Sequence, residues 1–248
     1  MKKREKKRRR IRRSPLRIII ALIGIMVGVL IIASTSYFNV KTYEVTGNSY
    51  YSKEEILVMG DCKDGKNIFW GTDLKDIESR LEKDAYIVSA KVKRKLPNAV
   101  SIKLDERKQV GAIVYGQHYV VIDADGTVLR NTEVDPQVTH VHGLTISKIE
   151  VGQPIEVEET VKLRQILEML SIMEKGDMYF VRIDMTESGA DAYVLENLVC
   201  KGTPQNIMDS MKTKNLQRVI TGLFSRNIER GTINISGGEY ISFNPGIE

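Results

Sequence analysis

The chain has 248 residues, of which 28% are charged and 42% hydrophobic, a globular composition that allows one large or two modest domains. Its formal net charge of +5 is unevenly distributed: residues 1–17 hold eleven Lys or Arg and one acid, which leaves 26 basic and 31 acidic residues in 18–248, a net charge of −5. The basic character therefore belongs to the tail, and the overall charge does not indicate a nucleic-acid-binding domain.

An uncharged segment follows this tail. Residues 18–33 are all Ile, Leu, Val, Met, Ala or Gly, and Tyr37 and Phe38 come after them. About 20 apolar residues span roughly 30 Å of hydrocarbon as a helix, and aromatic residues favour its interfaces. We predict a transmembrane helix over 18–38, with the tail 1–17 in the cytoplasm near anionic lipids and the remainder extracytoplasmic. A cleaved signal peptide is the alternative, although no A-x-A site follows the long apolar run.

Residues 40–106 predict a compact unit that begins with a strand and two helices. Gly47-Asn48 ends a strand that starts near Val40, and Ser52 with Glu55 forms a capping box at the start of a helix. A second helix starts near Thr72 or Asp73. Its predicted apolar face consists of Leu74, Ile77 and Leu81.

Two strands then complete this unit. Alternation predicts that Val88, Ala90 and Val92 in the first strand, and Val100, Ile102 and Leu104 in the second, face inward. Two helices can cover one face of the resulting three-stranded sheet. The other face would carry the basic side chains of Lys91, Lys93, Arg94, Lys95 and Lys103.

Five short segments of this unit resemble a known family. They are residues 45–48 (VTGN), 52–56 (SKEEI), 65–69 (GKNIF), 90–98 (AKVKRKLPN) and 102–107 (IKLDER). In this order, behind a single membrane helix, they resemble the POTRA domain of the bacterial cell division family FtsQ, called DivIB in Gram-positive bacteria. The resemblance implies a POTRA domain over 39–107.

Residues 108–248 predict a second module of strands with inserted helices. Strands are expected at 110–114, 119–122, 181–185, 192–195 and 198–201, with a tight turn at 123–126. An amphipathic helix is expected over 157–173, with Val161, Ile166, Leu167, Leu170 and Met173 inward. Ile207, Met211, Val219, Ile220, Leu223 and Phe224 mark further helix, with a break near Lys214. The predicted fold class is α+β: a transmembrane helix, a βααββ POTRA domain, and a mixed, antiparallel-rich β domain with helices.

The module closes with a predicted hairpin. Strands 232–236 and 239–243 flank Gly237-Gly238, a strong turn signal, and a final hairpin tends to lie at a sheet edge that can accept a strand from another chain. In the resembled family, partners of the FtsB or DivIC type, with FtsL, add to the C-terminal strands. The resemblance points to Ile233, Ile235, Tyr240, Ile241 and Phe243, which are equally explained as core residues.

No pattern in the sequence predicts catalysis, a cofactor or a metal. His140 and His142 form an H-x-H pair that no nearby Cys, Asp or Glu completes, and His118 stands alone. Cys200 lies among Leu and Val, which favours a core residue over a nucleophile, and Cys62 is expected to be a second separate thiol.

Together with the missing catalytic pattern, the resemblance implies a non-enzymatic bitopic scaffold at the division septum. The resemblance implies divisome partners and, through them, the septal peptidoglycan synthase complex. The rival interpretation is a POTRA-containing accessory protein for secretion or envelope assembly, although such modules usually occur in tandem before a membrane barrel. A wall-active enzyme is the third class.

Overall fold

The computed structural model describes residues 15–176, 178–237 and 240–246. The chain forms two compact units, one comprising Met1–Leu81 and Ser89–Leu104 and the other Glu82–Val88 and Asp105–Glu248. The predicted cytoplasmic tail, except for residues 15–17, and positions 238 and 239 of the predicted hairpin lie outside the described residues.

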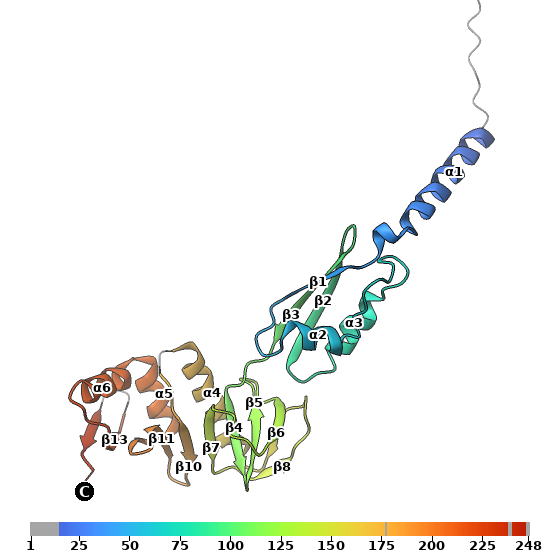
Figure 1. Ribbon diagram of the computed structural model, residues 1–248. Coiled ribbons are helices and arrows are strands. Elements are labelled where there is room, and N and C mark those ends of the chain that lie inside the picture. The colour runs from blue at the N-terminus through green and yellow to red at the C-terminus, as the bar shows by residue number, and fades with distance from the viewer. Residues whose placement is uncertain (1–14, 177, 238–239, 247–248) are drawn as a thin grey trace, which may run out of the picture. The chain divides into compact units, whose positions relative to one another are not determined.

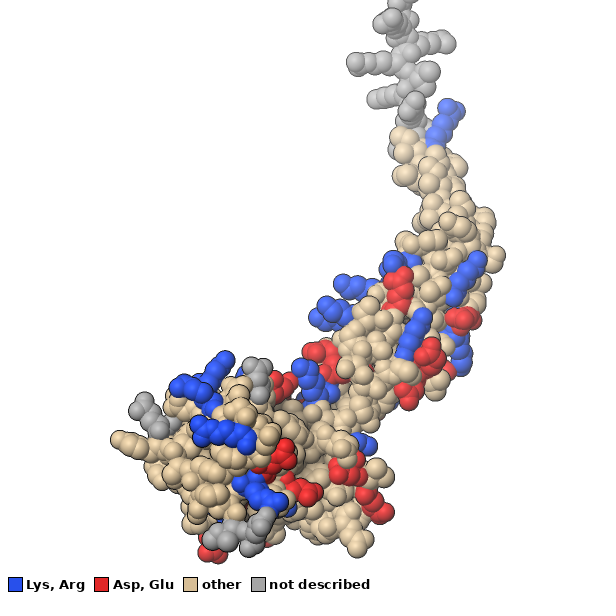
Figure 2. All heavy atoms as spheres, turned by 60° about the vertical axis from the view of Figure 1, so that its left-hand side comes forward, with Lys and Arg blue, Asp and Glu red and all other residues tan. Residues whose placement is uncertain are grey.

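Helix α1, Pro15–Ala33, contains the uncharged segment. Its window Leu16–Ala33 is long and apolar enough to cross a membrane, and none of it is buried. The face of α1 seen in Figure 2 is free of charged side chains beyond its N-terminal end. The helix begins and ends earlier than the expected range 18–38. Its first residue is a proline, which has no N–H group that needs an acceptor and therefore suits the start of a helix. A short 3-10 helix, η1 (Ser36–Phe38), follows α1.

The first unit has the predicted order of strand, helix, helix, strand, strand. It consists of β1 (Thr42–Thr46), α2 (Lys53–Met59), α3 (Leu74–Leu81), β2 (Ile87–Lys95) and β3 (Ala99–Glu106). The strands lie in the order β1-β3-β2, and β1 runs parallel to β3. Both helices cover one face of this sheet (Figure 1), against which Ile56, Ile77 and Leu81 are buried.

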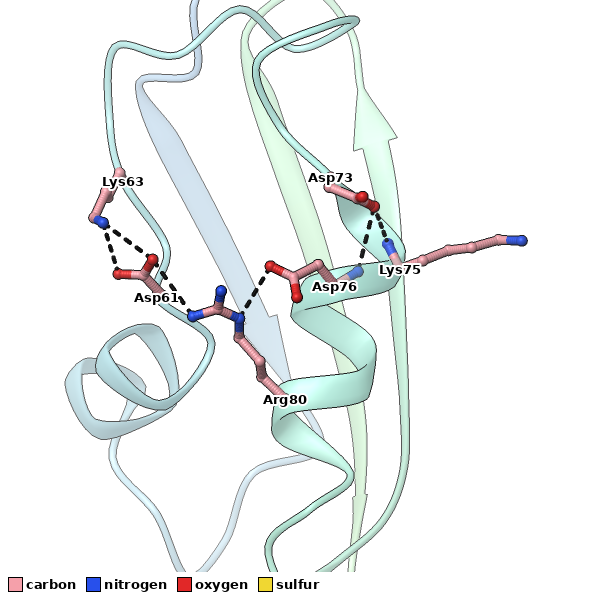
Figure 3. A network of polar contacts seen from close by, with 6 residues as sticks. All are labelled: Asp61, Lys63, Asp73, Lys75, Asp76 and Arg80. Atoms are coloured by element: carbon pink, nitrogen blue, oxygen red, sulfur yellow. Dashed lines mark hydrogen bonds and ion pairs between the residues drawn. The ribbon is translucent and has the colours of Figure 1, made fainter.

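Local polar contacts fix the ends of these helices. The Ser52 hydroxyl accepts the Glu55 N–H while Glu55 accepts the Ser52 N–H, so the predicted capping box at α2 is confirmed. At α3, the Asp73 carboxylate accepts the N–H groups of Lys75 and Asp76. Figure 3 shows how Arg80 of α3 contacts both its own helix and the loop after α2, with Nε 3.0 Å from Asp76 Oδ2 and Nη1 3.5 Å from Asp61 Oδ2.

Two details of the predicted sheet are wrong. Val88 is exposed and Ile87 is buried in its place, because the strict alternation of β2 begins only at Ala90. Arg94 does not join the lysines on the outer face, since its Nε donates to the carbonyl oxygen of Ile68, 2.6 Å away, in the loop before α3.

The second unit is built on one mixed sheet of nine strands. Its order is β14-β13-β12-β11-β10-β7-β4-β5-β6, with parallel pairs β4/β7, β7/β10 and β12/β13 and antiparallel pairs elsewhere. A separate two-stranded pair, β8 (Ile146–Lys148) and β9 (Glu156–Val157), lies between β7 and the first helix of this unit, α4, along the chain. The nine strands are β4 (Gly111–Tyr115), β5 (His118–Ile122), β6 (Val128–Thr132), β7 (Thr139–His142), β10 (Arg182–Met185), β11 (Ala190–Leu195), β12 (Leu198–Gly202), β13 (Gly231–Ile235) and β14 (Ile241–Asn244).

Three helices pack on this sheet: α4 (Thr160–Lys175), α5 (Pro204–Lys212) and α6 (Asn215–Phe224). In Figure 1 they lie along one side of the strands, and their apolar residues form a single core with the sheet. The predicted break near Lys214 is confirmed, since that residue has a φ of 59° between α5 and α6. The expected inward position of Val161 is wrong; it is exposed, and Met169 is buried instead.

Candidate functional site

The C-terminal strand β14 occupies the end of the nine-stranded sheet. It pairs antiparallel with β13, with Ile235 opposite Ile241 and Ile233 opposite Phe243. Its other side has no neighbouring strand in the part of the chain that the structure describes. The hairpin expected from the sequence is therefore present, with its outer strand at a sheet edge.

The five predicted partner-binding residues occupy different environments. Ile233 and Ile235 are buried in β13, between β12 and β14. Ile241 and Phe243 are partly buried against the same core, while Tyr240 is 79% exposed just before β14. Only Tyr240, Ile241 and Phe243 can contact another molecule directly. The side chains of Ile233 and Ile235 pack in the core beneath this edge.

The hydrogen-bond pattern shows which backbone groups of β14 face outward. The Ser236 N–H donates to the Tyr240 carbonyl oxygen at 3.1 Å, and the pairing continues in register along the hairpin. Antiparallel pairs alternate between bonded and non-bonded positions. The N–H and C=O groups of Ile241 and Phe243 therefore point away from β13, where an added strand could meet them.

A second feature is a cleft of about 600 Å³ over β7, β10 and β11 that sequence reasoning missed. The Arg182 guanidinium carbon lies 3.8 Å from the centre of the Tyr193 ring, and His140 Nε2 lies 3.1 Å from Asp135 Oδ1. No sequence pattern could have paired Arg182 with Tyr193, because their contact depends on the register of β10 and β11.

The histidines do not form a metal centre with other ligands in the described ranges, where no cluster of three His, Cys, Asp or Glu side chains occurs. His142 neighbours His140 on β7, and burial lowers its pKa, against an opposing effect of Asp184. His118 lies 3.9 Å from Glu133 at the exposed end of β5. His118 therefore lies apart from His140 and His142, which share β7.

Both cysteines are free thiols. Cys200 is completely buried in β12, and burial raises its pKa to about 12. Burial and the neighbouring carboxylates of Asp61 and Asp64 raise the pKa of Cys62 to about 11. A nucleophilic cysteine needs a lowered pKa and access to solvent, and Cys200 has neither.

Comparison with known proteins agrees with this architecture. Residues 38–107 match the model of the POTRA domain, FtsQ-type. The chain is 26% identical over 229 residues to the cell division protein DivIB of Bacillus subtilis, covering 89% of this chain and 80% of that protein. It is 29% identical over 179 residues to DivIB of Clostridium acetobutylicum, covering 71% of each.

A relative with the other family name is also similar: the cell division protein FtsQ of Syntrophotalea carbinolica is 29% identical over 179 residues, 69% of this chain and 61% of that protein. The regions matched by these relatives extend well beyond the POTRA domain and include parts of the nine-stranded sheet. With its apolar N-terminal helix, its FtsQ-type POTRA domain and these relatives, the chain belongs to the FtsQ/DivIB family of cell division proteins.

Proposed function

We propose that the protein is a non-enzymatic, bitopic membrane scaffold of the bacterial division machinery. Its tail lies in the cytoplasm, α1 crosses the membrane, and residues after Phe38 act outside it at the septum. The family membership and the apolar helix support this assignment, and the basic residues before α1 support the orientation. The protein then acts by recruiting division partners and supports septal peptidoglycan synthesis through them.

The edge position of β14 is the observation that carries the mechanism. Partners of the FtsB or DivIC type, together with FtsL, would add a strand along Ile241–Asn244 and bond to the outward backbone groups. Exposed Tyr240 would give the contact an aromatic anchor beside those backbone bonds. Confinement to the membrane by α1 raises the effective concentration of anchored partners.

The test compares Ile241→Pro with Ile241→Ala in dividing cells. Proline removes an N–H group that points away from β13, and edge strands tolerate proline at such positions. Alanine removes the same side chain but keeps the N–H. Co-purification of a tagged DivIC-type partner and its position at mid-cell are measured for both variants.

We expect the proline variant to lose the partner while the alanine variant retains most of it, with both variants still at the membrane in equal amounts. Equal partner recovery in the two variants would refute strand addition at β14. A protein spread evenly around the cell throughout the cycle would refute the division role itself.

A further inference from the structure

Four aromatic rings form a continuous row between the end of α1 and the loop before α3. The ring centroids are 5.2 Å apart for Tyr37 and Phe38, 5.4 Å for Phe38 and Phe69, and 5.7 Å for Phe69 and Trp70. Tyr37 is 63% exposed and Trp70 58% exposed, so both ends of the row face solvent in the isolated chain. Such exposure of large aromatic side chains requires an explanation.

Hydrogen bonds fix this loop to the chain that leaves α1. The Asn67 side-chain amide donates to the carbonyl oxygen of Ala33, the last residue of α1, at 2.9 Å. The Ile68 N–H donates to Phe38 O at 2.9 Å, and the Val40 N–H donates to Lys66 O at 2.9 Å. The loop at 66–70 is therefore held against the last residue of the membrane-spanning helix and the segment that directly follows it.

The turn between β2 and β3 lies at the same end of the unit. The Lys41 N–H donates to Asn98 O at 2.9 Å, and Arg94 donates from the base of that turn to Ile68 O. Leu96, at the tip, is 58% exposed. Figure 1 agrees, because the turn between β2 and β3 and the loop before α3 both lie toward α1 within this unit.

The charges at this end are mixed but include two exposed lysines. Lys41 lies three residues after η1, and Lys66 lies in the loop whose Ile68 N–H bonds to Phe38 O. The acids in this region include Asp64 and Glu44, and Glu44 pairs with Lys95 at 2.7 Å. Exposed basic side chains beside exposed aromatic ones are the composition expected at a lipid headgroup boundary, where Trp and Tyr sit at the interface and Lys interacts with anionic lipids.

We propose that this end of the POTRA domain is a lipid-contacting surface, which we call the interfacial surface and define by Tyr37, Lys41, Lys66, Trp70 and Leu96. It lies in the headgroup region of the same bilayer that α1 spans. The proposal rests on membrane anchoring by α1, as in the proposed function, and on nothing about division partners. It implies that the bilayer restrains the orientation of the POTRA domain as well as its distance from the membrane.

Trp70 permits a direct test because it is the only tryptophan of the chain. The full-length protein is reconstituted into phospholipid vesicles that contain anionic lipid, and only floated vesicles are analysed. Trp70 emission is recorded with lipids brominated near the headgroup end of the acyl chains, and with iodide added to the water. We expect loss of emission with brominated lipid, weak quenching by iodide, and a blue shift relative to the protein unfolded in urea.

A matched variant carries Trp70→Tyr and Tyr50→Trp. Tyr50 follows the end of β1 that lies away from α1. The five residues of β1 span about 17 Å, so we expect a tryptophan at position 50 to lie in water, outside the headgroup region. We expect iodide to quench it and brominated lipid to leave it unchanged. Strong iodide quenching of Trp70 on floated vesicles would overturn the proposal, as would equal brominated-lipid quenching at both positions. Failure of the protein to float would instead refute anchoring by α1.

Discussion

Arg107 Nη1 lies 2.7 Å from Asp123 Oδ2, and this pair joins the residue that follows β3 to the turn between β5 and β6. The Asp123 side chain is only 6% exposed. Its Oδ1 also accepts the N–H groups of Asp125, at 3.0 Å, and Thr127, at 2.7 Å. One buried carboxylate thus closes the predicted tight turn and holds the chain where it enters the nine-stranded sheet.

Asp123→Ala should destabilise the second unit by about 3 kcal/mol, because it leaves a partly buried guanidinium and two turn N–H groups without their acceptor. The matched control is Lys108→Ala, which removes the exposed ion pair with Glu174 and should cost at most about 1 kcal/mol. Hydrogen exchange of residues 118–132 measures both changes. Equal protection in the two variants would contradict the importance of the buried pair.

Gly47 and Gly65 both have positive φ, of 84° and 80°, but differ in their surroundings. A Cβ at Gly47 would overlap the Leu104 carbonyl oxygen, whereas a Cβ at Gly65 meets open space. Gly65→Ala should therefore cost only the backbone term of about 1 kcal/mol, and Gly47→Ala about 3 kcal/mol or more. Urea unfolding of the first unit, followed by Trp70 fluorescence, checks this order, which similar midpoints for the two variants would contradict.

Local signals in the sequence were sufficient for the elements of the first unit. The capping box at Ser52 and the Gly47-Asn48 turn act over a few residues, so they can be read without knowing the fold. The exposed position of Val88 could not be predicted, because β2 loses strict alternation at its start and the buried neighbour there is Ile87.

The candidate site shows a different limit. The Gly-Gly signal placed a hairpin at the C-terminus, but hydrophobicity alone could not separate Ile233 from Ile241. That distinction depends on strand order, since β13 has neighbours on both sides and β14 lies at the end of the sheet. The pairing of β12 with β13 joins segments about 30 residues apart around two helices, which no local pattern reports.

Cys200 should make the second unit less stable at alkaline pH. Burial raises its pKa from the usual 9.0 to about 12, so the unfolded thiol ionises first and the stabilisation, complete below pH 9, declines toward pH 12. Between pH 9 and 10 the decline should approach about 1.4 kcal/mol per pH unit. Urea midpoints by circular dichroism at pH 8, 9 and 10 for wild type and Cys200→Ala isolate this effect, since other groups cancel. Parallel pH dependences in the two proteins would contradict it.

Ile233→Ala and Tyr240→Ala should separate the core function of the hairpin from its proposed role in binding. Ile233 is completely buried between β12 and β14, so its truncation should cost about 2–4 kcal/mol and weaken partner capture only through unfolding. Tyr240 is exposed, so its truncation should leave the thermal midpoint within about 1 °C while reducing capture of a DivIC-type partner. Thermal unfolding and co-purification are measured on the same preparations, with Tyr240→Phe as the conservative control that keeps the ring. If Tyr240→Ala retained full capture, the exposed aromatic side chain would have no part in recognition, and the backbone groups of Ile241 and Phe243 alone would have to account for any binding at this edge.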